Sequence, residues 1–159
     1  MIIKRHTPTK RGTILVIDDE PDICCLFEQI LGEEGYTVLS AHNGLEGIAR
    51  HAESNADVII LDLKMPKMDG VETLQRIRKT DPEVMVIILT GYGSAETIRD
   101  VLDLNVYEYI SKPFENETVR RVVGEALTER NCKLRKADCG LQKGGCGELR
   151  IAERRGKKT

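Results

Sequence analysis

The chain has 159 residues, which suffice for one globular domain with tails and are too few for two independent cores. Apolar residues make up 40% and charged residues 31%, and no apolar run approaches the length of a membrane span, so the composition excludes a disordered polymer and a membrane protein. The net charge of −2 is unevenly spread, because residues 1–128 carry 14 Lys and Arg against 22 Asp and Glu, whereas residues 129–159 carry 10 against 4.

Apolar runs of strand length alternate with segments of helical periodicity along the chain, which predicts strands and helices in alternation around a parallel sheet. The predicted strands are 14–17, 36–39, 58–61, 84–89 and 106–110. Apolar residues recur at helical spacing within 23–31, 45–52, 71–77, 98–102 and 119–127, so we expect five helices. Pro21 suits the first turn of the first helix, and Gly35 suits its end.

The polarity of the strands predicts their order in the sheet. Strands covered on both faces are solidly apolar, whereas Thr37 and Glu108 interrupt the second and fifth strands, which we therefore place at the edges. This favours an α/β flavodoxin-like fold with strand order 2-1-3-4-5 and helices on both faces. In such sheets ligands bind at the carboxyl ends of the strands, beside the point where the order reverses. We expect the chemistry after Ile17 and after Leu61.

Three carboxylates stand at these two places, namely Asp18, Asp19 and Asp62. Carboxylates this close either keep a proton or recruit a cation, and an all-oxygen site with few protein ligands favours Mg²⁺. Thr90 ends the fourth strand and Lys112 follows the fifth, so a hydroxyl and an ammonium group should reach the same crevice. Such a set can transfer a phosphoryl group to a carboxylate, and Asp62 is the expected nucleophile.

Four segments resemble the receiver domains of two-component response regulators. They are Ile17-Asp-Asp-Glu20, the run from Asp62 through Pro66 to Asp69-Gly70, Leu89-Thr-Gly91, and Ser111-Lys-Pro-Phe114. The resemblance covers about residues 13–127, and the four segments stand in the right order at the ends of the first, third, fourth and fifth expected strands. It implies a phosphoacceptor signalling domain, not an enzyme.

The resemblance also implies roles for single residues. Asp62 would accept the phosphoryl group from a phosphohistidine of a sensor histidine kinase or a phosphotransfer protein. Asp19, Asp62 and the main-chain carbonyl of Lys64 would hold Mg²⁺, and Asp18 would act mostly through a water. Lys112 would hold a phosphoryl oxygen, and its bond to Pro113 resembles one that is cis in the family.

Switching is implied in the same way. Thr90 would move to the phosphoryl group, Gly91 would leave room for it, and Tyr109 would turn inward behind it. This would change the face made by the fourth helix, fifth strand and fifth helix, which could contact an unknown downstream protein or a second copy. Lys64 and Tyr92 occupy the variable positions that tune how quickly water removes the phosphoryl group.

The expected organisation is a basic extension at 1–12, the receiver at 13–128 and a basic tail containing Cys and Gly at 129–159. The acidic body argues against direct DNA binding, whereas the tail could touch phosphates or acidic partners. The apolar stretch after Gly12 breaks at Asp18, so it is not a signal peptide. Five cysteines, an odd number without disulfide-scaffold density, favour the cytoplasm.

Other interpretations compete with this one. An aspartyl-nucleophile phosphatase of the haloacid dehalogenase type also uses a carboxylate after a parallel strand, but it needs an acid where Lys64 stands. A redox or metal-sensing scaffold would use Cys132, Cys139 and Cys146, although no Cys-x-x-Cys pair or nearby histidine supports it. Cys24 and Cys25 are expected to be small apolar filler in the first helix. Acidic pairs such as Asp18-Asp19 can also merely cap a helix.

Overall fold

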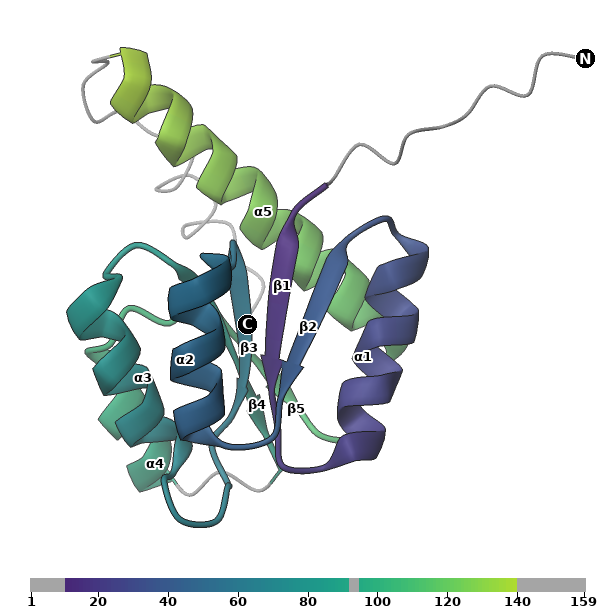
Figure 1. The fold of residues 1–159 in the computed structure, drawn as a ribbon, viewed down its shortest axis with the longest axis vertical. Helices are drawn as coiled ribbons and strands as arrows, with labels where there is room; N and C mark the ends of the chain where they lie inside the picture. Colours follow the sequence, from purple (N-terminus) through teal and green to yellow (C-terminus); the bar gives the residue numbers. More distant parts are fainter. Residues whose placement is uncertain (1–10, 92–94, 140–159) are drawn as a thin grey trace, which may run out of the picture.

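The computed structural model describes residues 11–91 and 95–139, excluding the side chains of 95–97 and 138–139. Strands and helices alternate throughout this part of the chain, as predicted (Figure 1). The elements are β1 (Thr13–Ile17), α1 (Pro21–Glu33), β2 (Thr37–Ala41), α2 (Gly44–Ser54), β3 (Val58–Asp62), α3 (Gly70–Thr80), β4 (Met85–Thr90), α4 (Ala95–Leu102), β5 (Glu108–Ser111) and α5 (Asn116–Cys139). None of the helices in the described part combines the length and the apolar character that crossing a bilayer requires.

The strands form one parallel sheet in the order β2-β1-β3-β4-β5, which confirms the predicted topology. Every residue of β1 and β3 is buried, whereas Thr37 on β2 is exposed and Glu108 on β5 is half-buried. The polar interruptions therefore did mark the edges. Strand β5 begins at Glu108 and not at residue 106, although the Tyr107 amide already donates to the Val86 carbonyl at 2.8 Å.

Side chains of β1 alternate between two apolar layers, one on each face of the sheet. Ile14 and Val16 pack with α1 and α5, where Phe27 and Val123 are fully buried. Leu15 and Ile17 point to the other face, which α2, α3 and α4 cover (Figure 1). The sheet is thus enclosed on both sides, and its carboxyl edge remains the place where polar chemistry can reach solvent.

Local signals fix where the helices begin and end. Pro21 stands in the first turn of α1, and Gly35 adopts a φ of +89° just after that helix. The Asn43 and Asp69 side chains accept hydrogen bonds of 2.8 Å from backbone amides in the first turns of α2 and α3. Helix α5 continues to Cys139, so residues 129–139 of the expected tail are helical.

Arg78 on α3 joins two connections at the amino-terminal edge of the sheet by donating hydrogen bonds to their main-chain carbonyls. Its guanidinium donates to Val84 at 2.7 Å, to Leu104 at 2.8 Å and to Asn105 at 2.9 Å, with longer bonds to Asp81 and Pro82. The fork of donors spans the α3–β4 turn and the loop between α4 and β5. Only arginine offers enough donors in one plane for this network.

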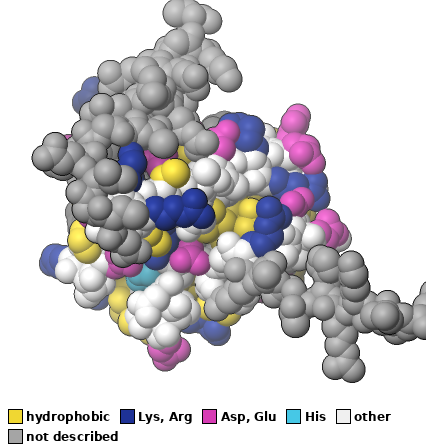
Figure 2. All heavy atoms as spheres, turned by 90° about the horizontal axis from the view of Figure 1, so that it is seen from above, with side chains coloured by type: hydrophobic (Ala, Val, Ile, Leu, Met, Phe, Trp, Pro, Cys, Tyr) yellow, Lys and Arg dark blue, Asp and Glu magenta, His cyan; other side chains and the backbone are white. Residues whose placement is uncertain are grey.

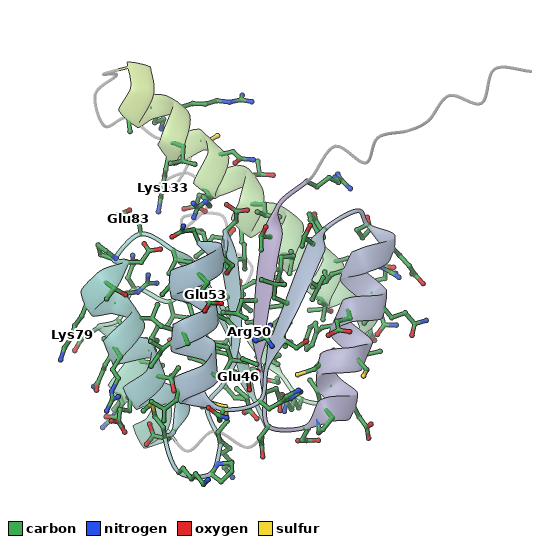
Figure 3. All side chains as sticks on the ribbon, in the orientation of Figure 1. Glu46, Arg50, Glu53, Lys79, Glu83 and Lys133 are labelled. Carbon is green, nitrogen blue, oxygen red and sulfur yellow. The ribbon has the colours of Figure 1, made fainter. Side chains whose placement is uncertain are left out.

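We predict that Arg78→Lys lowers the free energy of unfolding by about 2 kcal/mol, because several half-buried carbonyls lose their donors. Urea unfolding measures the change. The matched control is Arg50→Lys, since Arg50 makes only a 3.2 Å surface ion pair with Glu46 on α2 (Figure 3). That control should change stability by less than about 0.5 kcal/mol, and equal losses in the two variants would contradict the role given to Arg78.

Candidate functional site

The predicted charged groups meet at the carboxyl edge of the sheet. Asp18 follows β1, Asp62 ends β3, and both side chains are buried, with relative exposures of 0% and 3%. The Lys112 ammonium follows β5 and lies 3.0 Å from Asp18 Oδ2 and 3.4 Å from Asp62 Oδ2. The peptide bond between Lys112 and Pro113 is cis, as the resemblance implied. Residues nearly a hundred positions apart in sequence thus form one ionic cluster.

A third acid joins this cluster, and sequence reasoning gave it no role. Glu20 Oε1 lies 3.6 Å from Lys112 Nζ, and one oxygen each of Asp18, Glu20 and Asp62 lies within 4.8 Å of the others. The Glu20 amide donates to Asp18 Oδ1 at 2.9 Å, which turns the chain so that Glu20 faces back to the site. Asp19 is half-buried and is not in this group of three, so its role as a ligand stays a prediction.

The oxygen donors fit a hard divalent cation such as Mg²⁺, which binds few protein carboxylates and keeps waters. Three carboxylate oxygens at this spacing could surround one ion, while Lys112 partly offsets their mutual repulsion. In the part of the chain that the structure describes, this is the one group of three His, Cys, Asp or Glu side chains close enough to share an ion.

Burial and charge shift the proton affinities of the two central groups. Burial raises the pKa of Asp62 to about 6, and the negative charge of Asp18 adds to this, while the Lys64 amide at 3.0 Å and the Lys112 ammonium oppose it. Burial alone would lower the pKa of Lys112, but its hydrogen bond to Asp18 and the charges of Asp62, Asp18 and Glu20 raise it overall. Lys112 therefore stays charged beside a carboxyl group that ionises near neutral pH.

The predicted switch residues lie along β4 and β5. Thr90 is half-buried at the end of β4, where its carbonyl accepts a 2.7 Å bond from the Lys112 amide. A Cβ added to Gly91 would meet no atom within 4 Å, so open space surrounds this position. Tyr109 is half-buried against the apolar layer under α2, α3 and α4, and burial raises the pKa of its hydroxyl. Tyr92 lies outside the described residues.

Comparison with known proteins decides the family. The family model of the response regulator receiver domain matches residues 14–124. The chain belongs to the response-regulator receiver family. The match confirms the resemblance expected from the sequence, and it spans all five strands of the sheet. Receivers of this family serve two-component signalling.

Relatives of the receiver include short and long proteins. Sporulation initiation phosphotransferase F of Bacillus subtilis (strain 168) is 34% identical over 114 residues, which cover 72% of this chain and 92% of that protein. The transcriptional regulatory protein YkoG of the same organism is 36% identical over 124 residues, and the chain spans only 54% of its length. A CheY-like receiver domain protein from Methanospirillum hungatei JF-1 superposes with a TM-score of 0.73 at 32% identity, covering 76% of this chain and 96% of that one.

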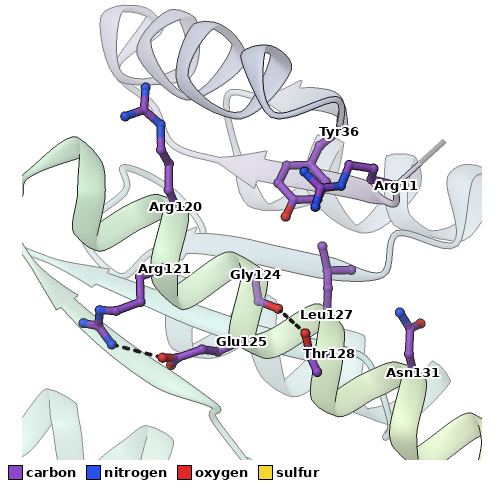
Figure 4. A pocket seen from close by; sticks show the side chains of 9 residues that line it. All are labelled: Arg11, Tyr36, Arg120, Arg121, Gly124, Glu125, Leu127, Thr128 and Asn131. Atoms are coloured by element: carbon purple, nitrogen blue, oxygen red, sulfur yellow. Dashed lines mark hydrogen bonds and ion pairs between the residues drawn. The ribbon is translucent and has the colours of Figure 1, made fainter. Parts of the chain in front are cut away.

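The receiver has a groove at the opposite end of the sheet from the acids. This groove of about 480 Å³ lies between the start of the sheet and α5 (Figure 4). Its arginines are already paired: Arg11 lies over the Tyr36 ring and donates to the Glu34 carbonyl, Arg120 bonds glutamates of α1, and Arg121 contacts Glu125. On the face seen in Figure 2, which views the molecule from the top of Figure 1, basic and acidic side chains are interspersed. The groove therefore offers no concentrated charge for a ligand.

Of the three tail cysteines, the structure describes the side chain of Cys132 alone. Cys132 is a free, half-buried thiol on α5, and the Cys139 side chain and Cys146 lie outside the described residues. Their role in a redox or metal-sensing scaffold stays a prediction.

Gly70, which begins α3, packs directly against the end of β3, where Asp62 lies. A Cβ at this position would lie 2.5 Å from the Asp62 carbonyl oxygen and 2.6 Å from Leu63 Cα, both of which are backbone atoms. The Gly70 amide also donates to the Leu63 carbonyl at 3.1 Å. Any larger residue must push the β3–α3 connection away, and Asp62 with it.

We predict that Gly70→Ala lowers the free energy of unfolding by about 2 kcal/mol, since backbone cannot yield as a flexible side chain can. The matched control is Gly32→Ala on α1, where an added Cβ meets nothing within 4 Å. That control should leave stability unchanged or raise it by up to about 1 kcal/mol, because alanine is the better helix former. Urea unfolding of both variants tests the contact, and an unchanged stability in Gly70→Ala would refute it.

The raised pKa of Asp62 predicts how stability depends on pH when no divalent ion is present. The folded receiver keeps a proton on Asp62 up to about pH 6, whereas the ordinary carboxyl of the unfolded chain loses it near 3.8, so this group costs the folded state increasing free energy between those values. With a chelator, Asp62→Asn should therefore be more stable than the wild type by about 3 kcal/mol at pH 8 and by less at pH 5.

Urea unfolding at the two pH values measures this difference. The control is Asp103→Asn, an exposed residue after α4, which should show no such dependence. If the wild type were as stable as Asp62→Asn at pH 8, the surroundings of Asp62 would not destabilise its ionised form.

Proposed function

We propose that this receiver accepts a phosphoryl group on Asp62 from a phosphohistidine of a sensor histidine kinase or a phosphotransfer protein, with Mg²⁺ at the site. One observation carries the proposal: the Lys112 ammonium lies between the carboxylates of Asp18 and Asp62 at the carboxyl edge of the sheet. A purely structural ion pair needs one acid for one cation. The surplus of buried carboxylate here is costly for the fold and suits the binding of a metal and an anion together.

The transfer step follows from the chemistry of these groups. A carboxylate oxygen of Asp62 forms a bond to phosphorus, the bond from phosphorus to the histidine nitrogen breaks, and the nitrogen keeps its electron pair. The Lys112 ammonium is placed to offset charge that gathers on the phosphoryl oxygens. Because the pKa of Asp62 is about 6, the nucleophile is mostly ionised at neutral pH even before a cation lowers that value further.

Bound Mg²⁺ would supply positive charge to both the nucleophile and the incoming phosphoryl oxygens. In our proposal, Asp62, Asp19 and the carbonyl of Lys64 hold it directly, and Asp18 acts through a water. The acid cluster adds Glu20 to this set, since its carboxylate already shares the space with Asp18 and Asp62. The ends of β1 and β3, with the turns that follow them, carry all of these oxygens.

The signal would pass through Thr90 and Tyr109 to the face formed by α4, β5 and α5, which would contact a downstream protein or a second copy. Two observations support this route. The Lys112 amide bonds the Thr90 carbonyl, so the two elements that approach the phosphoryl group are linked directly. The open space at Gly91, next to Thr90, would leave room for the phosphoryl group. Lys64 is exposed beside the site, where it and Tyr92 would tune the access of water.

We further propose that the receiver signals by protein contact and makes no direct contact with DNA. The excess of Asp and Glu over Lys and Arg in residues 1–128 supports this proposal, because a negatively charged body is repelled by DNA phosphates. YkoG is a transcriptional regulatory protein, and since the chain spans 54% of it, this proposal concerns the receiver alone. Phosphatase turnover is disfavoured because Lys64, exposed two residues after Asp62, cannot serve as the general acid such enzymes need.

The deciding experiment is incubation with Mg²⁺ and a small acyl phosphate, followed by intact mass measurement. The wild type should gain one phosphoryl group, and Asp62→Asn should gain none, because it lacks the carboxylate nucleophile. Asp103→Asn should behave as the wild type, because Asp103 is exposed whereas Asp62 is buried beside Lys112. Omitting Mg²⁺ should suppress the adduct. An adduct of equal yield on Asp62→Asn, or none on the wild type, would defeat the proposal.

A further inference from the structure

Glu20 precedes α1 at the position of a helix cap, but its side chain faces the acid cluster. It is the N-cap residue of α1, yet its carboxylate accepts no hydrogen bond from the amides of the first turn. Instead, Glu20 Oε1 lies 3.6 Å from the ammonium nitrogen of Lys112. The Glu20 side chain is 60% exposed, whereas Asp18 and Asp62 are buried. Glu20 therefore lies on the solvent side of the cluster.

The three acids occupy the surroundings of the Lys112 ammonium. An ammonium group has three protons to donate. The Lys112 nitrogen lies 3.0 Å from a carboxylate oxygen of Asp18 and 3.4 Å from one of Asp62. Glu20 is the third acid at this nitrogen, with the longest of the three contacts. An incoming phosphoryl oxygen can therefore bond the ammonium before transfer only if one of the acids withdraws.

Glu20 is the acid that can withdraw most easily. The buried carboxylates are each fixed by a backbone amide, because Asp18 Oδ1 accepts a 2.9 Å bond from Glu20 and Asp62 Oδ1 accepts a 3.0 Å bond from Lys64. Among the described residues, the Glu20 carboxylate has no hydrogen-bond partner, and its contact with Lys112 is an ion pair. Exposed ion pairs of this kind are weak, so the Glu20 side chain can turn away at little cost.

We infer that Glu20 is a displaceable counter-ion of Lys112, which holds the place of a phosphoryl oxygen at the ammonium and slows phosphorylation by small anionic donors. The inference rests on the proposed phosphorylation of Asp62 and adds a regulating residue to it. Before transfer, the Glu20 side chain turns away and frees one proton of the ammonium for the donor. Glu20 itself makes and breaks no covalent bond. Repulsion between its carboxylate and the donor acts in the same direction.

The test compares second-order rate constants for phosphorylation of the full chain by a small acyl phosphate, followed by intact mass measurement. In this reaction an oxygen of Asp62 bonds phosphorus, and the acyl oxygen leaves with its electron pair as a carboxylate. Mg²⁺ is raised for each variant until the rate no longer changes, so that differences in metal affinity do not enter. Glu20→Gln should react about three- to fivefold faster than the wild type, the size expected for loss of one exposed ion pair.

Two further variants separate displacement from a general effect of charge. Asp22→Asn removes the same charge from an exposed position in the first turn of α1, and it should keep the wild-type rate. Glu20→Asp keeps the charge but is shorter by one methylene group, so it loses the contact with Lys112 and should also react faster. The inference is overturned if Glu20→Gln or Glu20→Asp reacts no faster than the wild type, or if Asp22→Asn matches Glu20→Gln. A wild type that gains no phosphoryl group would instead contradict the proposed function.

Discussion

The ammonium group of Lys112, held between buried carboxylates, is the interaction around which this domain is arranged. Three separate strands must end at the same edge before Asp18, Asp62 and Lys112 can meet. The cluster does not make the fold stable, since removing such charges from water costs about as much as their attraction returns. Stability comes from the two apolar layers that enclose the sheet. These layers offset the repulsion among the carboxylates at the carboxyl edge, which a bound cation would relieve.

Much of this arrangement could be predicted from the sequence, because short stretches of residues indicated each strand and several of these patterns pointed to the same strand order. Solid apolar runs identified the central strands, Thr37 and Glu108 identified the edges, and the parallel topology then carried Asp62 and Lys112 to one place. Glu20 escaped prediction because it faces the site only through the turn that the Asp18 side chain forms with its amide. That geometry depends on side-chain direction, which a linear motif does not specify.

Two other features needed coordinates for different reasons. The closeness of Gly70 to the Asp62 carbonyl is a contact between backbones, and a glycine in a loop motif does not say which atoms it approaches. The continuation of α5 through residues 129–139 was obscured because that stretch lacks an apolar period, although its Lys, Leu, Arg and Ala residues are good helix formers. Cys24 was likewise interpreted from its residue type, whereas its polar neighbours are the Asp18 carbonyl after β1 and the His42 imidazole after β2.

Helix α5 is longer than the sheet beneath it requires, and its end stands clear of the body (Figure 1). Arg130 holds it at the rim: its guanidinium lies 3.2 Å from the carboxylate of Asp57, which in turn accepts a 2.8 Å bond from the amide that opens β1. The nine residues beyond this point reach about 14 Å, so a tilt of roughly 10° at the rim would carry the tip through about 2.5 Å. The protruding part of α5 therefore acts as a lever: a small change in packing at Arg130 produces a larger displacement at the end of the helix.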